Sequence, residues 1–242
     1  MRILLTAALM AGVSAIAAPA FAADMPYYPP VIDIPDVDYG YSGSFYLRGS
    51  AGLNLMWAHR VNHPTVTPST YSITEYGYGY SIGAGAGFET GTGARFDVTY
   101  DYLSNNGMTA AINDGAGPMV DGNHRLSLRS SVLLANAYYD FGLSEGYGAA
   151  GGVFGYVGAG AGVAFNDATV TDPLGAQVRS QNTSLAAAGM VGVGYDFGQV
   201  VADVGYRALY INRIENTTAP YPFSVDDNWV HEVRGTVRYR FN

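Results

Sequence analysis

Glycine-rich segments are the first candidates for chemistry in this sequence. Gly146–Gly151 has the G-x-G-x-x-G spacing of a dinucleotide-binding loop, and Ser81–Thr90 (SIGAGAGFET) and Val157–Phe165 (VGAGAGVAF) carry glycine at every second position. A phosphate-binding loop of this kind lies between a strand and a helix, so that amides at the helix start face the pyrophosphate. The residues after Gly151 alternate with no helical period, and neither run completes the motif. The glycines therefore do not predict a nucleotide site.

Histidine-containing segments give little support for catalysis or metal binding. His59 and His63 have the spacing of metal ligands on a helix, but they precede Pro64 in a segment without helical signals. A hydrolase site on a strand needs a base and a nucleophile two residues apart, whereas His124 and Ser127 are three apart. The two Asp-Phe-Gly tripeptides lack the other motifs of a kinase. We expect no enzyme activity, no metal site and no cofactor.

The composition differs from that of a soluble domain. Of the 242 residues, 48% are hydrophobic and only 13% are charged, with 32 Gly and 20 Tyr, whereas about a quarter of the residues in soluble domains are charged. Cysteine is absent, which excludes disulfides and thiolate metal ligands. All 12 basic residues are Arg, and without Arg2 the remaining 11 face 20 acidic residues, a formal charge of −9. This balance argues against a nucleic-acid partner.

The sequence of the first 43 residues predicts a signal for export followed by an extended tail. Arg2, the apolar run Ile3–Ala18 and the small-x-small sequence Ala20–Ala22 have the order of a cleaved secretory signal, so we expect a signal peptide at residues 1–22. Residues 23–43 contain four Pro and four Asp without periodicity. They predict an extended periplasmic tail, because proline fixes φ and removes a backbone donor.

Eight segments alternate between apolar and polar residues, which places one set of side chains on each face of a strand. In the fourth segment the apolar parity changes between Leu128 and Leu133, so we expect either a β-bulge near Ser130–Val132 or a strand that begins later. The eight segments are residues 44–57, 77–89, 94–103, 125–141, 153–165, 185–197, 200–210 and 229–241.

Connections of alternating length complete the fold prediction. Long connections (58–75, 104–124, 166–181, 212–228) alternate with short ones (89–93, 142–149, 198–199). Together with an even strand number, this indicates an all-β, eight-stranded antiparallel up-and-down transmembrane β-barrel over residues 44–242. A membrane helix at 146–165 is disfavoured, because eight of those 20 residues are Gly, each costing about 1 kcal/mol relative to Ala.

Two groups of side chains follow from this barrel. Aromatic residues at the strand ends predict girdles at the two membrane–water interfaces, namely Phe45, Trp57, Phe88, Tyr139, Phe141, Tyr195, Phe197, Trp229, Tyr239 and Phe241. An eight-stranded interior is just wide enough for side chains, and charges in it must be paired. We therefore expect an ion-pair lattice in the lumen, with solvated separate charges as the alternative, from Arg48, Arg95, Asp97, Asp101, Arg129, Asp140, Asp196, Asp203, Arg207, Glu232, Arg234, Arg238 and Arg240.

Five motifs carry a resemblance to a known family: FYLRGSAG (45–52), ANAYYDFG (135–142), YVGAGAGVAF (156–165), DVGYRALY (203–210) and HEVRGTVRYRF (231–241). In register across residues 44–242, they resemble the small bacterial outer-membrane β-barrels that include opacity-like surface antigens. The resemblance implies a C-terminal aromatic residue recognised by the barrel-assembly machinery. Phe241 fits that role, although Asn242 follows it.

These observations predict an integral protein of the bacterial outer membrane, exported through the periplasm. We expect a structural and surface role, with exposed loops, a side-chain-filled lumen and no chemistry of its own. Its expected surroundings are outer-membrane lipid and lipopolysaccharide. A narrow porin-like channel for ions or small solutes is the alternative, and a lipid-modifying barrel enzyme is less favoured.

Overall fold

The regular elements of the chain are β-strands. The computed structural model describes residues 43–62, 70–113, 120–143, 151–216 and 223–241. The strands are β1 (Ser44–Asn62), β2 (Thr70–Glu75), β3 (Gly77–Glu89), β4 (Ala94–Asn113), β5 (Gly122–Gly142), β6 (Gly152–Thr171), β7 (Gln177–Asp196), β8 (Val200–Asn216) and β9 (Phe223–Phe241). No described segment is a helix long and apolar enough to cross a bilayer. The predicted signal peptide, nearly all of the predicted tail, and Asn242 lie outside the described residues.

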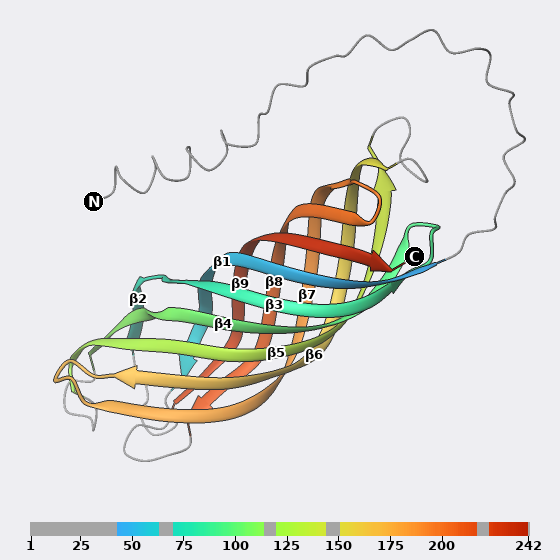
Figure 1. Cartoon of the computed structure of the whole chain (residues 1–242). Coiled ribbons are helices and arrows are strands. Elements are labelled where there is room, and N and C mark those ends of the chain that lie inside the picture. The colour runs from blue at the N-terminus through green and yellow to red at the C-terminus, as the bar shows by residue number, and fades with distance from the viewer. Residues whose placement is uncertain (1–42, 63–69, 114–119, 144–150, 217–222, 242) are drawn as a thin grey trace, which may run out of the picture. The chain divides into compact units, whose positions relative to one another are not determined.

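The strands close into one antiparallel barrel (Figure 1). Their order is β2-β4-β3-β1-β9-β8-β7-β6-β5, and pairing of β4 with β5 joins the two ends of the sheet. β2 and β3 both pair with β4 and are separated only by Tyr76, so they act as one interrupted strand. The barrel is therefore eight-stranded, which confirms the predicted fold class.

The strands are much longer than predicted. β4 to β7 have 20 or 21 residues each, whereas about 9–11 residues suffice for a tilted strand to cross a bilayer. Most of the residues predicted as long connections, such as 104–113 and 166–171, continue the strands. The boundaries predicted for these connections were wrong, because only the membrane-facing part of each strand has apolar residues outward.

The two faces of the wall exchange their polarity along β5. Towards the C-terminal end of the strand, outward residues are apolar, and Leu133 is 42% exposed. Towards the other end, Arg125 and Arg129 point outward, whereas Leu128 points inward and is 1% exposed. Pairing with β6 is continuous from Arg125 to Gly142, so the expected bulge near Ser130–Val132 is wrong. The apolar residues of β5 therefore move from the outer face to the inner face because the surroundings of the wall change along the strand. The strand itself is not interrupted.

An apolar core fills the part of the barrel farthest from the chain ends at Ser44 and Phe241. We call this part the distal half. At its far end the barrel resembles a soluble β-barrel, with apolar residues inside and polar residues outside. The part of the core nearer the chain ends lies behind outward apolar residues such as Leu133 and Leu185. The core comprises Met56, Leu103, Met108, Leu126, Leu128, Val132, Leu134, Ala164, Ala168, Ala186, Ala188, Leu209, Ile211, Ile214, Val225 and Val230.

Glycines in β3 and β6 lie where the wall faces large inward side chains. A Cβ atom on Gly85 would lie 2.7 Å from the Val98 carbonyl oxygen and 2.8 Å from Thr99 Cγ2. On Gly158 it would meet the ring of Tyr138, and on Gly160 the amide of Asn136. The alternate glycines therefore leave room for the lumen side chains of neighbouring strands.

Adjacent substitutions in β3 test this assignment of faces. We expect Gly85→Leu to destabilise the folded barrel by about 1–3 kcal/mol, because the side chain enters a filled interior. Ala86→Leu adds the same chain on the exposed outer face and should leave the urea midpoint nearly unchanged. Urea titrations in lipid vesicles, followed by tryptophan fluorescence, compare the two. Equal tolerance of both substitutions would contradict the assignment.

Candidate functional site

The lumen of the half nearer the chain ends holds a lattice of ion pairs. Within the described residues, six arginines contact seven carboxylates, so the lattice is within one charge of neutrality. Most of these side chains are nearly inaccessible to solvent. We define this lumen lattice as Arg48, Arg95, Arg207, Arg234, Arg238, Arg240, Glu89, Asp97, Asp101, Asp140, Asp196, Asp203 and Glu232.

Asp101 joins two arginines at the boundary with the apolar core. Arg207 Nη1 donates to Asp101 Oδ2 at 2.7 Å, and Arg234 Nη2 donates to Asp101 Oδ1 at 2.5 Å. Arg207 Nε also donates to Glu232, which lies opposite it in the neighbouring strand. Asp101 is on β4, across the lumen from β8 and β9, so this contact connects opposite walls of the barrel.

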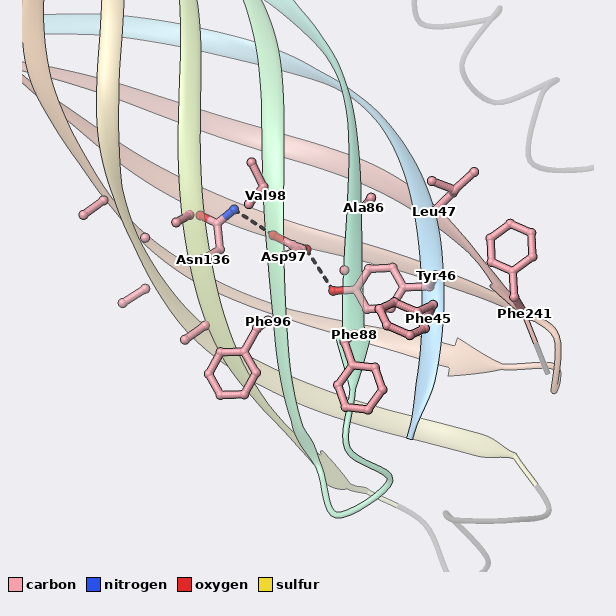
Figure 2. Close-up of a pocket in the computed structure, with 16 residues that line it drawn as sticks. Phe45, Tyr46, Leu47, Ala86, Phe88, Phe96, Asp97, Val98, Asn136 and Phe241 are labelled. Carbon is pink, nitrogen blue, oxygen red and sulfur yellow. Dashed lines mark hydrogen bonds between the residues drawn. The ribbon is translucent and has the colours of Figure 1, made fainter. Parts of the chain in front are cut away.

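Asp97 is the centre of a second group. Arg48 Nη1 donates to its Oδ2 at 2.8 Å, and the Tyr46 hydroxyl donates to the same oxygen at 3.0 Å. Asn136 Nδ2 donates to Oδ1 at 2.8 Å. Figure 2 shows Tyr46, Asp97 and Asn136 linked in this way. Arg48 also donates to the Tyr138 hydroxyl at 2.8 Å, so hydroxyl and amide groups complete the coordination of the charges.

The third group lies near the chain ends. Arg95 Nε donates to both oxygens of Asp140 at 2.9 Å, and its guanidinium lies 3.9 Å from the centre of the Tyr138 ring. Arg238 is within 3.5 to 4.0 Å of three carboxylates, those of Glu89, Asp140 and Asp203. The remaining member, Arg240, bonds to Asp196 at 2.6 Å and also contacts Glu89.

One predicted lattice member was wrong, and several members were missed. Arg129 is exposed on the outer wall, because β5 keeps one alternation and its inward positions at this height are Leu128 and Ser130. The other twelve predicted charges lie in the lumen lattice. Sequence reasoning missed Glu89, although it shares the inward parity of the glycines. It also missed the polar partners Tyr46, Asn136, Tyr138 and Tyr156.

The predicted girdle residues lie on the outer wall or at its edges. Phe45, Tyr139, Phe197 and Phe241 are exposed near the chain ends. We call the band of exposed apolar residues on the outer wall, which includes Val98, Leu133 and Leu185, the apolar belt. At its edge away from the chain ends, Trp57 pairs with Trp229, and the Trp229 ring lies 5.2 Å from that of Tyr210. Their contact with a membrane interface stays a prediction.

A hollow of about 980 Å³ on the outer wall runs across β1, β3, β4, β5 and β6. Figure 2 shows Phe45, Phe88, Phe96 and Phe241 beside it. Its floor consists of small side chains such as Ala86, and it faces away from the lumen. Beside the lattice, the lumen holds a cavity of about 10 Å³ lined by residues such as Arg48 and Arg207, roughly the room of one water molecule.

The described side chains offer no group of three His, Asp or Glu placed to hold a metal ion. The side chains of His59 and His63 lie outside the described set. His231 faces outward and hydrogen-bonds to the Tyr206 hydroxyl, whereas its neighbour Glu232 faces the lumen.

Removing one charge tests the role of the lattice. Asp101→Asn leaves Arg207 and Arg234 short of a carboxylate in a dry lumen. We expect it to lower the free energy of unfolding by about 3–5 kcal/mol. The matched control is Asp167→Asn on the outer wall, which should change the urea midpoint little, since solvent screens that pair. Equal midpoints for both variants would show that pairing in the lumen contributes little.

Comparison with known proteins supports the class that the geometry indicates. No protein-family model and no curated protein matches the sequence. Among solved structures, the chain is similar to Neisserial surface protein A (NspA), with 25% identity, a TM-score of 0.50, and coverage of 83% of this chain and 99% of that one. It is also similar to the outer membrane protein OprG from Pseudomonas aeruginosa, with 15% identity, a TM-score of 0.49, and coverage of 85% and 100%. The closed eight-stranded fold and the likeness to NspA identify the chain as a bacterial outer-membrane β-barrel protein of the small, eight-stranded class.

Proposed function

We propose that this protein has a structural and surface role in the outer membrane, with a closed lumen and no chemistry of its own. The observation that carries the proposal is that side chains fill both halves of the barrel. The lumen lattice occupies one half and the apolar core occupies the other. An ion crossing the barrel would have to displace both, and breaking buried ion pairs costs several kcal/mol.

The arrangement of potential catalytic groups supports a non-enzymatic role. His124 is buried on the inner face, with Nδ1 3.3 Å from the Gly122 carbonyl oxygen, whereas Ser127 faces outward. A base and a nucleophile on opposite faces of one strand cannot share a substrate. His231 and Glu232 are separated in the same way.

A narrow channel is the second candidate function, and one feature of the lattice favours it. Arg238 Nε and Nη2 are buried and make no hydrogen bond within the described structure, although three carboxylates lie nearby. A guanidinium with unused donors has other arrangements available to it, and a rearranged lattice would open a path on that side of the lumen.

Two further parts of the proposal concern biogenesis. We propose that residues 1–22 direct export and are removed. We also propose that the barrel-assembly machinery binds the end of β9, where Phe241 is exposed on the outer wall.

Planar-bilayer recording distinguishes the closed barrel from the channel. The purified protein should give no stable openings, because the lumen lattice fills one half of the barrel and the apolar core fills the other. Arg238→Ala removes the guanidinium with unused donors and serves as the comparison, with brief small openings as the expected result. Large, stable, nanosiemens-scale openings of the unaltered protein would contradict the closed barrel.

A further inference from the structure

Three arginines project from the outer wall of the distal half. Arg125 and Arg129 are on β5 and Arg179 is on β7, and all three are exposed. β6 lies between these strands and contributes Asp167 and Thr169 to the same face. We call Arg125, Arg129 and Arg179 the arginine patch. Arg129 and Arg179 are separated by two strand spacings and by two residues along the strands, which together place their backbones about 12 Å apart. Two arginine side chains that lean towards each other can bind one ligand across this distance.

The patch carries net positive charge in an acidic chain. Asp167 accepts a hydrogen bond from Arg179 Nε at 2.7 Å, and this bond holds the pKa of Asp167 below its usual range. Arg129 makes no hydrogen bond or ion pair among the described residues. Arg125 Nε donates to the Asn106 carbonyl oxygen at 2.8 Å.

Other acidic residues of the described chain also lie in this region. Asp121 precedes β5, and Asp172 follows β6, where it accepts hydrogen bonds from the backbone amides of Leu174 and Ala176. Glu75 lies on β2, beyond β4, where it accepts a hydrogen bond from Thr109 Oγ1 at 3.1 Å. The arginine patch exceeds its own acid, Asp167, by two charges, while the chain without residues 1–22 has a formal charge of −9.

The patch directly adjoins the apolar belt. Arg129 pairs with Asp167, and the next outward residue of β6 towards the chain ends is Phe165, which is 50% exposed. On β7, the outward sequence passes from Arg179 through two polar residues to Leu185, which is 70% exposed. A ligand with acyl chains against the belt would therefore place its headgroup among the arginines.

We propose that the arginine patch binds the phosphate groups of lipid A in the outer leaflet of the outer membrane. Guanidinium groups match phosphate because their planar fork donates two parallel hydrogen bonds. The proposal rests on the orientation implied by the proposed function. In that orientation, the chain ends and short turns face the periplasm, so the distal half faces outward.

Native mass spectrometry of the full barrel in detergent tests the proposal with defined lipids. We expect the unaltered protein to bind bisphosphorylated lipid A at least about tenfold more tightly than dephosphorylated lipid A, a difference of about 1.4 kcal/mol. The triple variant Arg125→Gln, Arg129→Gln, Arg179→Gln should lose this preference. The corresponding triple Lys variant should retain part of it, because the charge remains while the planar fork is lost.

Arg60→Gln is the matched control, because it removes one charge from β1, on the side of the barrel opposite β6. It should bind bisphosphorylated lipid A like the unaltered protein. Reduced gel mobility after boiling verifies that each variant is folded. If the triple Gln variant does not fold, the triple Lys variant takes its place, and a preference for bisphosphorylated lipid A that is undiminished in that variant would overturn the proposal.

Three results would overturn the proposal: equal binding of phosphorylated and dephosphorylated lipid A, a preference retained by the triple Gln variant, or equal competition by phosphatidylglycerol. The last result would assign the patch to anionic lipids in general. Failure here is distinguishable from failure of the proposed function. A conducting barrel that still prefers phosphorylated lipid A would overturn the closed lumen and leave the arginine patch in place.

Discussion

A guanidinium group inside a narrow barrel must meet a carboxylate, because too little water remains there to solvate it. This requirement accounts for the architecture of the half nearer the chain ends. Asp101 on β4 bonds across the lumen to Arg207 and Arg234. Asp97 accepts hydrogen bonds from Arg48 and from two neutral side chains, Tyr46 and Asn136. Glycines on β3 and β6 provide the space for these side chains. The resulting interior is nearly neutral, and the cavity beside Arg48 and Arg207 has room for about one water molecule.

The outer wall contacts lipid in one part and water in another, and the outward residues of the strands change from apolar to polar between the two parts. Near the chain ends, apolar residues face outward and charges are enclosed. In the distal half, leucines and alanines are enclosed, and polar residues face outward beyond Leu133 on β5 and Leu185 on β7. A strand can make this exchange without a bulge, because shifting the apolar residues by one position moves them to the opposite face. β5 does so between Leu128 and Leu133 while its pairing continues.

The fold class and the membrane-facing segments could be predicted from the sequence, since apolar-out alternation ended by aromatic residues is a local pattern. The distal extensions of the strands could not be predicted. Their apolar residues are small or few on each strand, and they face the interior instead of the outside. Arg129 was misplaced for that reason. The pairing of Arg207 with Asp101, which are 106 residues apart, depends on the stagger of strands around the barrel. No local pattern contains that information.

The central claim is that the outer wall passes from lipid to water within β5 while the strand continues unbroken. Spin labels at successive outward positions of β5, from Arg125 to Phe141, measure this directly through their accessibility to oxygen and to a water-soluble nickel chelate. Labels from Leu133 to Phe141 should favour oxygen, and labels from Arg125 to Arg129 should favour nickel. Oxygen-favouring accessibility along the whole strand would contradict the account.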